Sequence, residues 1–122
     1  MKTNTHVHQR PWGTWTLLSK EDHSLVKIIQ VNPNARLSEQ SHVFRNEHWV
    51  IIEGRGLISI DGVDQVYSQN QYVFIPKGSK HRVKNIDPQK PLLIVEVQTG
   101  EKCIEEDIIR YDDDYGRVTP QL

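Results

Sequence analysis

Short apolar segments separated by turn-forming residues constrain the fold of this chain most. Clusters of Gly, Pro, Asn and Asp recur at intervals of roughly 8 to 12 residues and bound segments rich in Val, Ile and Leu. No segment shows the apolar period of 3.6 residues that an amphipathic helix requires. We therefore expect about nine short strands in an all-β sandwich or barrel.

The expected strands lie between these turns. Asp61-Gly62 is a two-residue connection typical of a type I′ hairpin. Residues 49–53 are apolar at nearly every position, which predicts burial between two layers. The acidic, mixed tail at 105–117 leaves a helical turn and a strand both open. The expected strands are residues 14–18, 25–31, 35–42, 49–53, 57–60, 63–67, 71–75, 81–85 and 92–99.

The composition sets the class of protein and of partner. At 122 residues without repeats or linkers, we expect a single domain, 1–122, with a core at about 10–117. Fifteen Lys and Arg balance 16 Asp and Glu, so charge gives no case for nucleic acid or a membrane surface as partner. A single cysteine, Cys103, and a polar start without a signal-like apolar core at residues 1–9 predict a cytoplasmic protein.

Two separated turns bring metal-ligand residue types together. In an extended segment Gln40 and His42 share one face, and the loop 43–46 returns the chain so that Glu47 enters it from the next strand. The Pro-Gly turn at 76–78 delivers His81 to the start of another strand. Imidazole, carboxylate and amide ligands suit a divalent metal of borderline hardness, so we predict a site of Gln40, His42, Glu47 and His81.

Other polar side chains are expected beside this site. By strand alternation, Arg36 and Ser38 share the face of His42, and Lys27 lies on a strand that reads as buried. Glu96 and Gln98 alternate on one face of the last long strand, and we expect them to line a cavity rather than to face solvent. Arg36, Lys27 and Gln98 are therefore predicted to bind substrate.

The chain resembles the cupin superfamily, and more narrowly the type II mannose-6-phosphate isomerases, over residues 10–117. The resemblance rests on several motifs in one order: RPWG at 10–13, ARLS-x-Q-x-H at 35–42, R-x-EHW at 45–49, IP-x-G-x-x-HR at 75–82, EVQ-x-G at 96–100 and DI-x-R-x-x-DDYGR at 107–117. The family commonly has a run of histidines where this chain has His42-Val43-Phe44. The resemblance includes no nucleotide-binding pattern, so nucleotidyl transfer is not expected of these residues alone.

The resemblance implies a jelly-roll fold, a double-stranded β-helix, and metal-dependent isomerisation of mannose 6-phosphate to fructose 6-phosphate. It favours Zn²⁺, with Co²⁺, Mn²⁺ or Fe²⁺ as alternatives, and makes Arg45 the catalytic residue outside the metal set. Arg10, Arg110 and Arg117 match the family's terminal motifs, and Arg110 and Arg117 are predicted substrate ligands. Glu96, His48 and Glu53 are all conceivable as the base, with His48 expected on the opposite face.

Two other classes of function stay open. One is a metal-bearing, sugar-binding cupin without activity, and the other is a different cupin enzyme, a dioxygenase or an epimerase. By analogy with cupins we also expect a homodimer whose interface includes Trp12, Trp15 and apolar outer strand positions.

Overall fold

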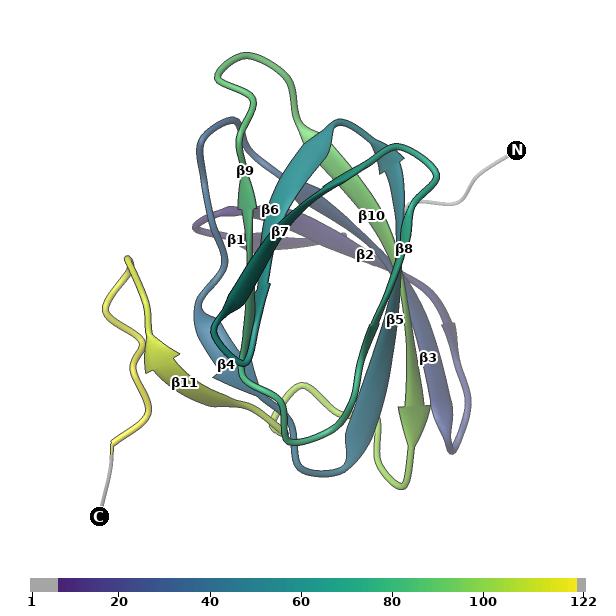
Figure 1. Ribbon diagram of the computed structural model, residues 1–122. Coiled ribbons are helices and arrows are strands. Elements are labelled where there is room, and N and C mark those ends of the chain that lie inside the picture. The colour runs from purple at the N-terminus through teal and green to yellow at the C-terminus, as the bar shows by residue number, and fades with distance from the viewer. Residues whose placement is uncertain (1–6, 121–122) are drawn as a thin grey trace.

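The computed structural model describes residues 7–120, which form eleven strands and no helix. Two antiparallel sheets face each other across a shared interior (Figure 1). The strand orders are β1-β2-β3-β10-β5-β8 and β11-β4-β9-β6-β7. The strands are β1 Val7–Arg10, β2 Gly13–Lys20, β3 Ser24–Val31, β4 Glu39–Ser41, β5 Arg45–Glu53, β6 Arg55–Ile60, β7 Val63–Ser68, β8 Tyr72–Ile75, β9 His81–Asn85, β10 Leu92–Gly100 and β11 Ile109–Asp112.

The all-β prediction is confirmed, and most expected strands lie where the sequence indicates. Asp61 and Gly62 have φ angles of 49° and 85°, the left-handed pair that a type I′ hairpin needs, and Ile60 pairs with Val63. Within the described residues no helix offers the long apolar stretch that a membrane crossing requires. Residues 1–6 belong to the segment that is expected to lack a signal, and they lie outside the described range. Residues 121–122, at the other end of the expected domain, also lie outside it.

The predicted strand at 35–42 is wrong in extent. Only Glu39–Ser41 forms regular strand, and Arg36 makes an isolated bridge to Lys84. The segment before β4 is irregular, because the consecutive residues Leu37 and Ser38 are both buried and neither belongs to a regular strand. Alternation of side chains therefore cannot be counted back from His42 to residue 36.

Strand β5 begins earlier than predicted and is buried on one face only. Arg45, Glu47, Trp49 and Ile51 alternate inward. The prediction of burial on both faces is wrong, since Val50 and Ile52 are exposed on the outer surface. Because β5 and β10 are antiparallel, Glu47 pairs with Gln98 and Ile51 with Ile94, so one half of their shared inner face is polar and the other apolar.

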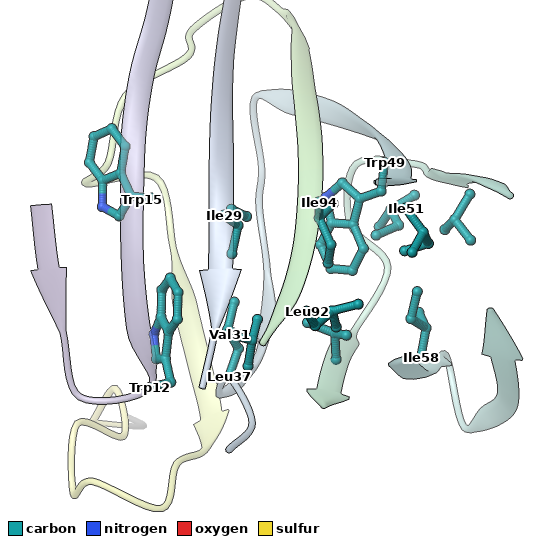
Figure 2. Close-up of a cluster of buried hydrophobic side chains, with 13 residues drawn as sticks. Trp12, Trp15, Ile29, Val31, Leu37, Trp49, Ile51, Ile58, Leu92 and Ile94 are labelled. Atoms are coloured by element: carbon teal, nitrogen blue, oxygen red, sulfur yellow. The ribbon is translucent and has the colours of Figure 1, made fainter. Parts of the chain in front are cut away.

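The apolar half is a cluster of buried side chains from both sheets that includes three tryptophans (Figure 2). Trp12 and Trp15 are 6% and 5% exposed, so they offer little surface to a second subunit, and the homodimer stays a prediction. Trp15 points inward because strand β2 alternates from Gly13, with Gly13 and Trp15 buried and Thr14 and Thr16 only partly buried. Trp12 lies in the turn that precedes β2. The cluster is Trp12, Trp15, Ile29, Val31, Leu37, Trp49, Ile51, Ile58, Val73, Ile75, Val83, Leu92 and Ile94.

Candidate metal centre and cavity

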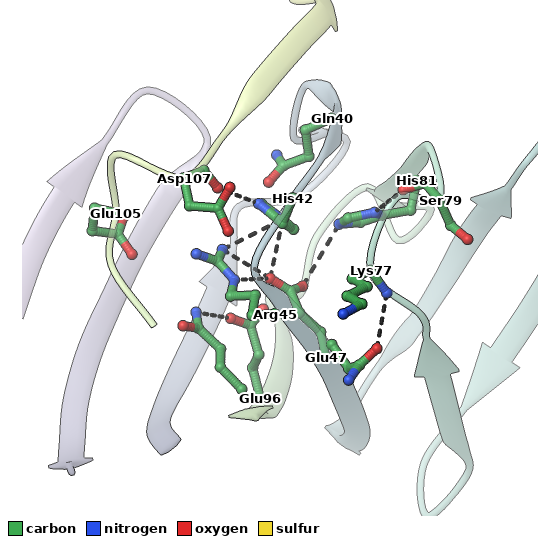
Figure 3. Close-up of polar contacts among 12 residues, drawn as sticks. Gln40, His42, Arg45, Glu47, Lys77, Ser79, His81, Glu96, Glu105 and Asp107 are labelled. Carbon is green, nitrogen blue, oxygen red and sulfur yellow. Dashed lines mark hydrogen bonds and ion pairs between the residues drawn. The ribbon is translucent and has the colours of Figure 1, made fainter. Parts of the chain in front are cut away.

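The predicted metal ligands come from both sheets. Gln40 on β4 pairs directly with His81 on β9, His42 follows β4, and Glu47 lies on β5 of the opposite sheet. The ligand atoms of His42, Glu47 and His81 lie within 4.8 Å of one another, and all three side chains are buried. Figure 3 shows both imidazoles directed toward the Glu47 carboxylate. The tertiary structure thus brings together residues that the sequence separates by 39 positions, 42 to 81.

The spacing of these atoms fits one shared divalent ion. His42 Nε2 lies 3.1 Å from Glu47 Oε2, and His81 Nε2 lies 3.6 Å from Glu47 Oε1. Ligand atoms about 2.1 Å from a tetrahedral zinc are about 3.4 Å apart. His81 Nε2 is also buried without a hydrogen-bond partner in the described part of the chain, so its lone pair is available to a metal ion.

The hydrogen bonds behind each imidazole select the tautomer that a metal needs. Nδ1 of His42 lies 2.7 Å from the Asp107 carbonyl oxygen, and Nδ1 of His81 lies 3.0 Å from that of Ser79. A carbonyl oxygen only accepts, so both Nδ1 atoms carry the proton. Each Nε2 then presents its lone pair toward Glu47, as metal-ligating histidines do.

Gln40, the predicted fourth ligand, lies beside His81 as its strand partner. Its amide nitrogen donates to Ser38 Oγ at 2.9 Å, which leaves the carbonyl oxygen as the remaining acceptor. It lines the same cavity as Glu47 and His81. Two imidazoles and one carboxylate are a set that catalytic zinc sites use, and a weakly held amide oxygen as fourth ligand is readily displaced.

Arg45 is a buried residue of β5, not a loop residue as its sequence position suggested. Only 4% of its surface is exposed, and its Nε donates to Glu47 Oε2 at 2.9 Å. One terminal nitrogen lies 3.4 Å from His42 Nε2, and the other donates to the Ile104 carbonyl at 2.8 Å. The guanidinium therefore neutralises the same carboxylate that faces the two histidines.

Burial and neighbouring charges shift the pKa values at this centre. Burial by itself would raise the pKa of Glu47, but His42 and His81 hold it well below its ordinary value. Burial opposes protonation of His81, but Glu47 outweighs it and raises the pKa of His81. Burial, followed by repulsion from Glu47, raises the pKa of Glu96. The centre thus favours an ionised Glu47, the form that binds a metal.

Asp107 holds the loop that carries His42. Its carboxylate oxygens accept hydrogen bonds from the backbone amides of Val43 and Phe44 at 2.8 and 2.9 Å, and its carbonyl accepts from His42. Sequence reasoning missed this role. The available signal was its position at the start of the family's DI-x-R motif, since nothing in its own spacing indicates a contact more than 60 residues away.

The centre opens into a cavity of about 590 Å³, including the solvent at its mouth. Trp12, Trp15 and Trp49 give it an aromatic wall, and Glu96 lies inside it. Glu96 is 2% exposed and accepts hydrogen bonds from Trp49 Nε1 at 2.8 Å and Gln98 Nε2 at 2.7 Å. The basic side chains of the lining are Arg10, Lys27, Arg45, Arg82, Arg110 and Arg117.

The structure separates the predicted substrate residues into two groups. Lys27, Arg110 and Arg117 line the cavity. The prediction that Arg36 shares the ligand face is wrong, because it lies outside this cavity and forms a two-bond pair with Asp114 at 2.7 and 2.8 Å. Gln98 faces inward as expected, but it is fully buried and absent from the lining, so it supports Glu96 instead of reaching a ligand.

Two further expectations can be compared with the fold. His48 points away from the centre as predicted, with its Nδ1 2.7 Å from the Tyr72 hydroxyl, and Glu53 is exposed near the far end of β5. Val43 is 55% exposed, and neither Val43 nor Phe44 lines the cavity. The departure from the family's histidine run therefore leaves the cavity lining unchanged.

The sequence profile of the mannose-6-phosphate isomerase C-terminal family matches residues 1–113. The chain belongs to this family. A relative named alginate biosynthesis protein AlgA, of Pseudomonas fluorescens, is 42% identical over 121 residues, 98% of this chain and 25% of that protein. A mannose-1-phosphate guanylyltransferase of Escherichia coli (strain K12) is 40% identical over 110 residues, 89% of this chain and 23% of that protein. This member of the family thus spans about a quarter of the length of these relatives.

Solved structures similar to this member of the mannose-6-phosphate isomerase C-terminal family are cupins. An RmlC-like cupin from Shewanella frigidimarina has a TM-score of 0.72 at 14% identity, with 84% of this chain and 87% of that chain covered. KdgF from Halomonas sp. has a TM-score of 0.73 at 10% identity, with 82% and 88% covered. At these identities the likeness shows the fold alone, and the fold is the cupin double-stranded β-helix.

Proposed function

We propose that the chain is a metal-dependent aldose–ketose isomerase that interconverts mannose 6-phosphate and fructose 6-phosphate. The observation that carries the proposal is the convergence of His42, Glu47 and His81, with both Nδ1 atoms tied back, in a cavity lined by basic residues. Membership of the mannose-6-phosphate isomerase C-terminal family supports the choice of substrate.

The bound ion would supply Lewis acidity toward the sugar oxygens, and with a single carboxylate among its ligands it keeps a net positive charge. Zinc is our first expectation, and cobalt, manganese and iron also suit the ligand set. Gln40, His42, Glu47 and His81 would hold it.

The reaction moves a proton between C2 and C1 of the sugar through a cis-enediolate. Arg45 is the residue whose charge would stabilise the negative oxygen atoms of that intermediate, because its guanidinium lies beside the centre. Glu96 is the residue we assign to carry the proton. It lies in the cavity lining, and its hydrogen bonds to Trp49 and Gln98 fix its orientation.

The test is a coupled assay for fructose 6-phosphate formed from mannose 6-phosphate by zinc-loaded protein. We expect turnover that disappears on metal removal and returns when metal is restored. Glu96→Gln should lower kcat by about 100-fold or more while mannose 6-phosphate still binds. Absence of turnover with each of zinc, cobalt, manganese and iron would contradict the proposal.

A second candidate is a metal-bearing module that binds sugar phosphates without converting them. It is favoured by Arg45, which must release Glu47 or Ile104 before it reaches a substrate oxygen. The same assay separates the two functions, because the module would bind mannose 6-phosphate and form no product. Metal analysis addresses the other cupin enzymes, since a dioxygenase needs iron and an epimerase needs no metal.

A further inference from the structure

Most of the basic side chains in the cavity are already neutralised by a carboxylate. Four of the six have an acidic partner: Lys27 with Glu105 at 3.2 Å, Arg45 with Glu47 at 2.9 Å, Arg82 with Asp112 at 2.9 Å and Arg117 with Asp113 at 2.8 Å. Among the described residues, Arg10 and Arg110 have no such partner. They are therefore the cavity cations whose charge is free for an incoming anion.

Arg110 has the strongest need of a partner. Its Nε is buried and forms no hydrogen bond within the described part of the chain. Burial, together with the nearby positive charges of Arg117 and Arg10, lowers the pKa of Arg110. A buried charged donor without an acceptor costs free energy that a bound anion would recover.

Trp15 supplies a neutral donor in the same lining. Among the described residues its indole Nε1 is also buried without a hydrogen-bond partner, and the Arg10 guanidinium lies 5.8 Å from the centre of its ring. Strands β2 and β11 thus contribute two buried donors without a hydrogen-bond partner among the described residues, Trp15 Nε1 and Arg110 Nε. Strand β1 adds the Arg10 guanidinium, which donates to the Gln9 carbonyl at 2.7 Å and has no carboxylate partner in the described part of the chain.

We propose that Arg10, Arg110 and the indole N–H of Trp15 bind the phosphate group of a sugar phosphate. A phosphate dianion offers several acceptor oxygens, and charge-assisted bonds from guanidinium groups are the strong kind. The identity of the sugar rests on the proposed function, whereas the anion site rests on these three residues. Lys27 and Arg117, predicted from the sequence as substrate ligands, are already paired and play a smaller part.

The test is calorimetry on metal-free protein with inorganic phosphate, and on zinc-loaded protein with mannose 6-phosphate and mannose. Wild type should bind phosphate, and should bind mannose 6-phosphate at least about tenfold more tightly than mannose. Arg110→Gln should remove this preference, Arg10→Gln and Trp15→Phe should reduce it, and Arg110→Lys should keep part of it. The matched control is Arg55→Gln, an exposed arginine of β6 outside the cavity lining, which should bind like wild type.

Each outcome has a defined meaning. Phosphate binding that is unchanged in Arg110→Gln and Arg10→Gln, or absent from wild type, would overturn the site. A folded Arg110→Lys variant with wild-type thermal unfolding keeps the result interpretable if Arg110→Gln is unstable. Phosphate binding lost in the variants, together with no isomerase turnover in wild type, would reject the proposed reaction and retain the anion site.

Discussion

The two imidazoles of the candidate centre differ in their partners from the amide that lies beside them. Among the described residues Nε2 of His81 has no hydrogen bond, whereas the amide nitrogen of Gln40 already donates to Ser38 Oγ. We expect His81→Ala to weaken zinc binding beyond the roughly 10- to 100-fold that loss of a supporting partner costs. Gln40→Ala should have a smaller effect, because an amide oxygen is the weaker zinc ligand. Competition with a chromophoric chelator measures both, and equal losses would contradict the ligand ranking.

Arg45 links the stability of the protein to the presence of metal. Removal of one partner of a buried ion pair costs about 3–5 kcal/mol, since the other charge stays buried and unpaired. Arg45→Ala should therefore destabilise the metal-free protein by about 3 kcal/mol, and zinc, which would neutralise Glu47 instead, should restore much of that loss. Urea unfolding with and without zinc provides the measurement. A loss that is the same in both states would show that Glu47 and the metal do not interact.

At the scale of elements, the segment between β10 and β11 controls the loop that follows β4. Asp107 accepts two backbone hydrogen bonds from that loop. We expect Asp107→Ala to lower the free energy of unfolding by about 2 kcal/mol, because two partly buried backbone amides lose a charged acceptor. Zinc affinity should fall as well, since the Asp107 carbonyl that orients His42 is no longer fixed.

The control for Asp107 is Asp112→Ala, which removes the exposed carboxylate at the end of β11 that pairs with Arg82. An exposed pair contributes about 1 kcal/mol or less, and zinc affinity should not change. The two variants are compared by urea unfolding and chelator competition. Wild-type zinc affinity in Asp107→Ala would show that the loop keeps its shape without this residue.

For the whole molecule, the centre predicts a bell-shaped dependence of stability on pH in the metal-free protein. The pKa of Glu47 is depressed, so its contribution is complete above its ordinary value of 4.5 and is lost as pH falls through the folded-state value. The pKa of His81 is raised, so its contribution is complete below its ordinary value of 6.5 and is lost as pH rises through the folded-state value. The difference in unfolding midpoint between wild type and Glu47→Gln should therefore be largest between pH 4.5 and pH 6.5. A difference that does not vary with pH would contradict the coupling.

The sequence by itself determined the class of fold and predicted the residues of the candidate metal site, three of which the fold brings together. Strand segments and turns are local properties, so Asp61-Gly62 and the strand at residues 25–31 could be recognised from their own residues. The ligand set could be predicted because its spacing occurs in one order with the other family motifs. What local patterns could not give was the extent of β4, because Leu37 and Ser38 are both buried, which breaks the alternation on which Arg36 was assigned.

Only the tertiary structure decided which basic residues share the cavity and which of them lack a carboxylate partner. Arg36, Lys27, Arg110 and Arg117 look equivalent in the sequence, since each is a single basic residue within or beside a strand. The fold pairs Arg36 with Asp114 outside the cavity, neutralises Lys27 and Arg117 inside it, and leaves Arg110 unpaired. These differences depend on contacts between residues far apart in the chain and on burial, which determines how strongly each charge is felt. The packing of β11 and its flanking segments against the cavity determines which of these basic residues is paired.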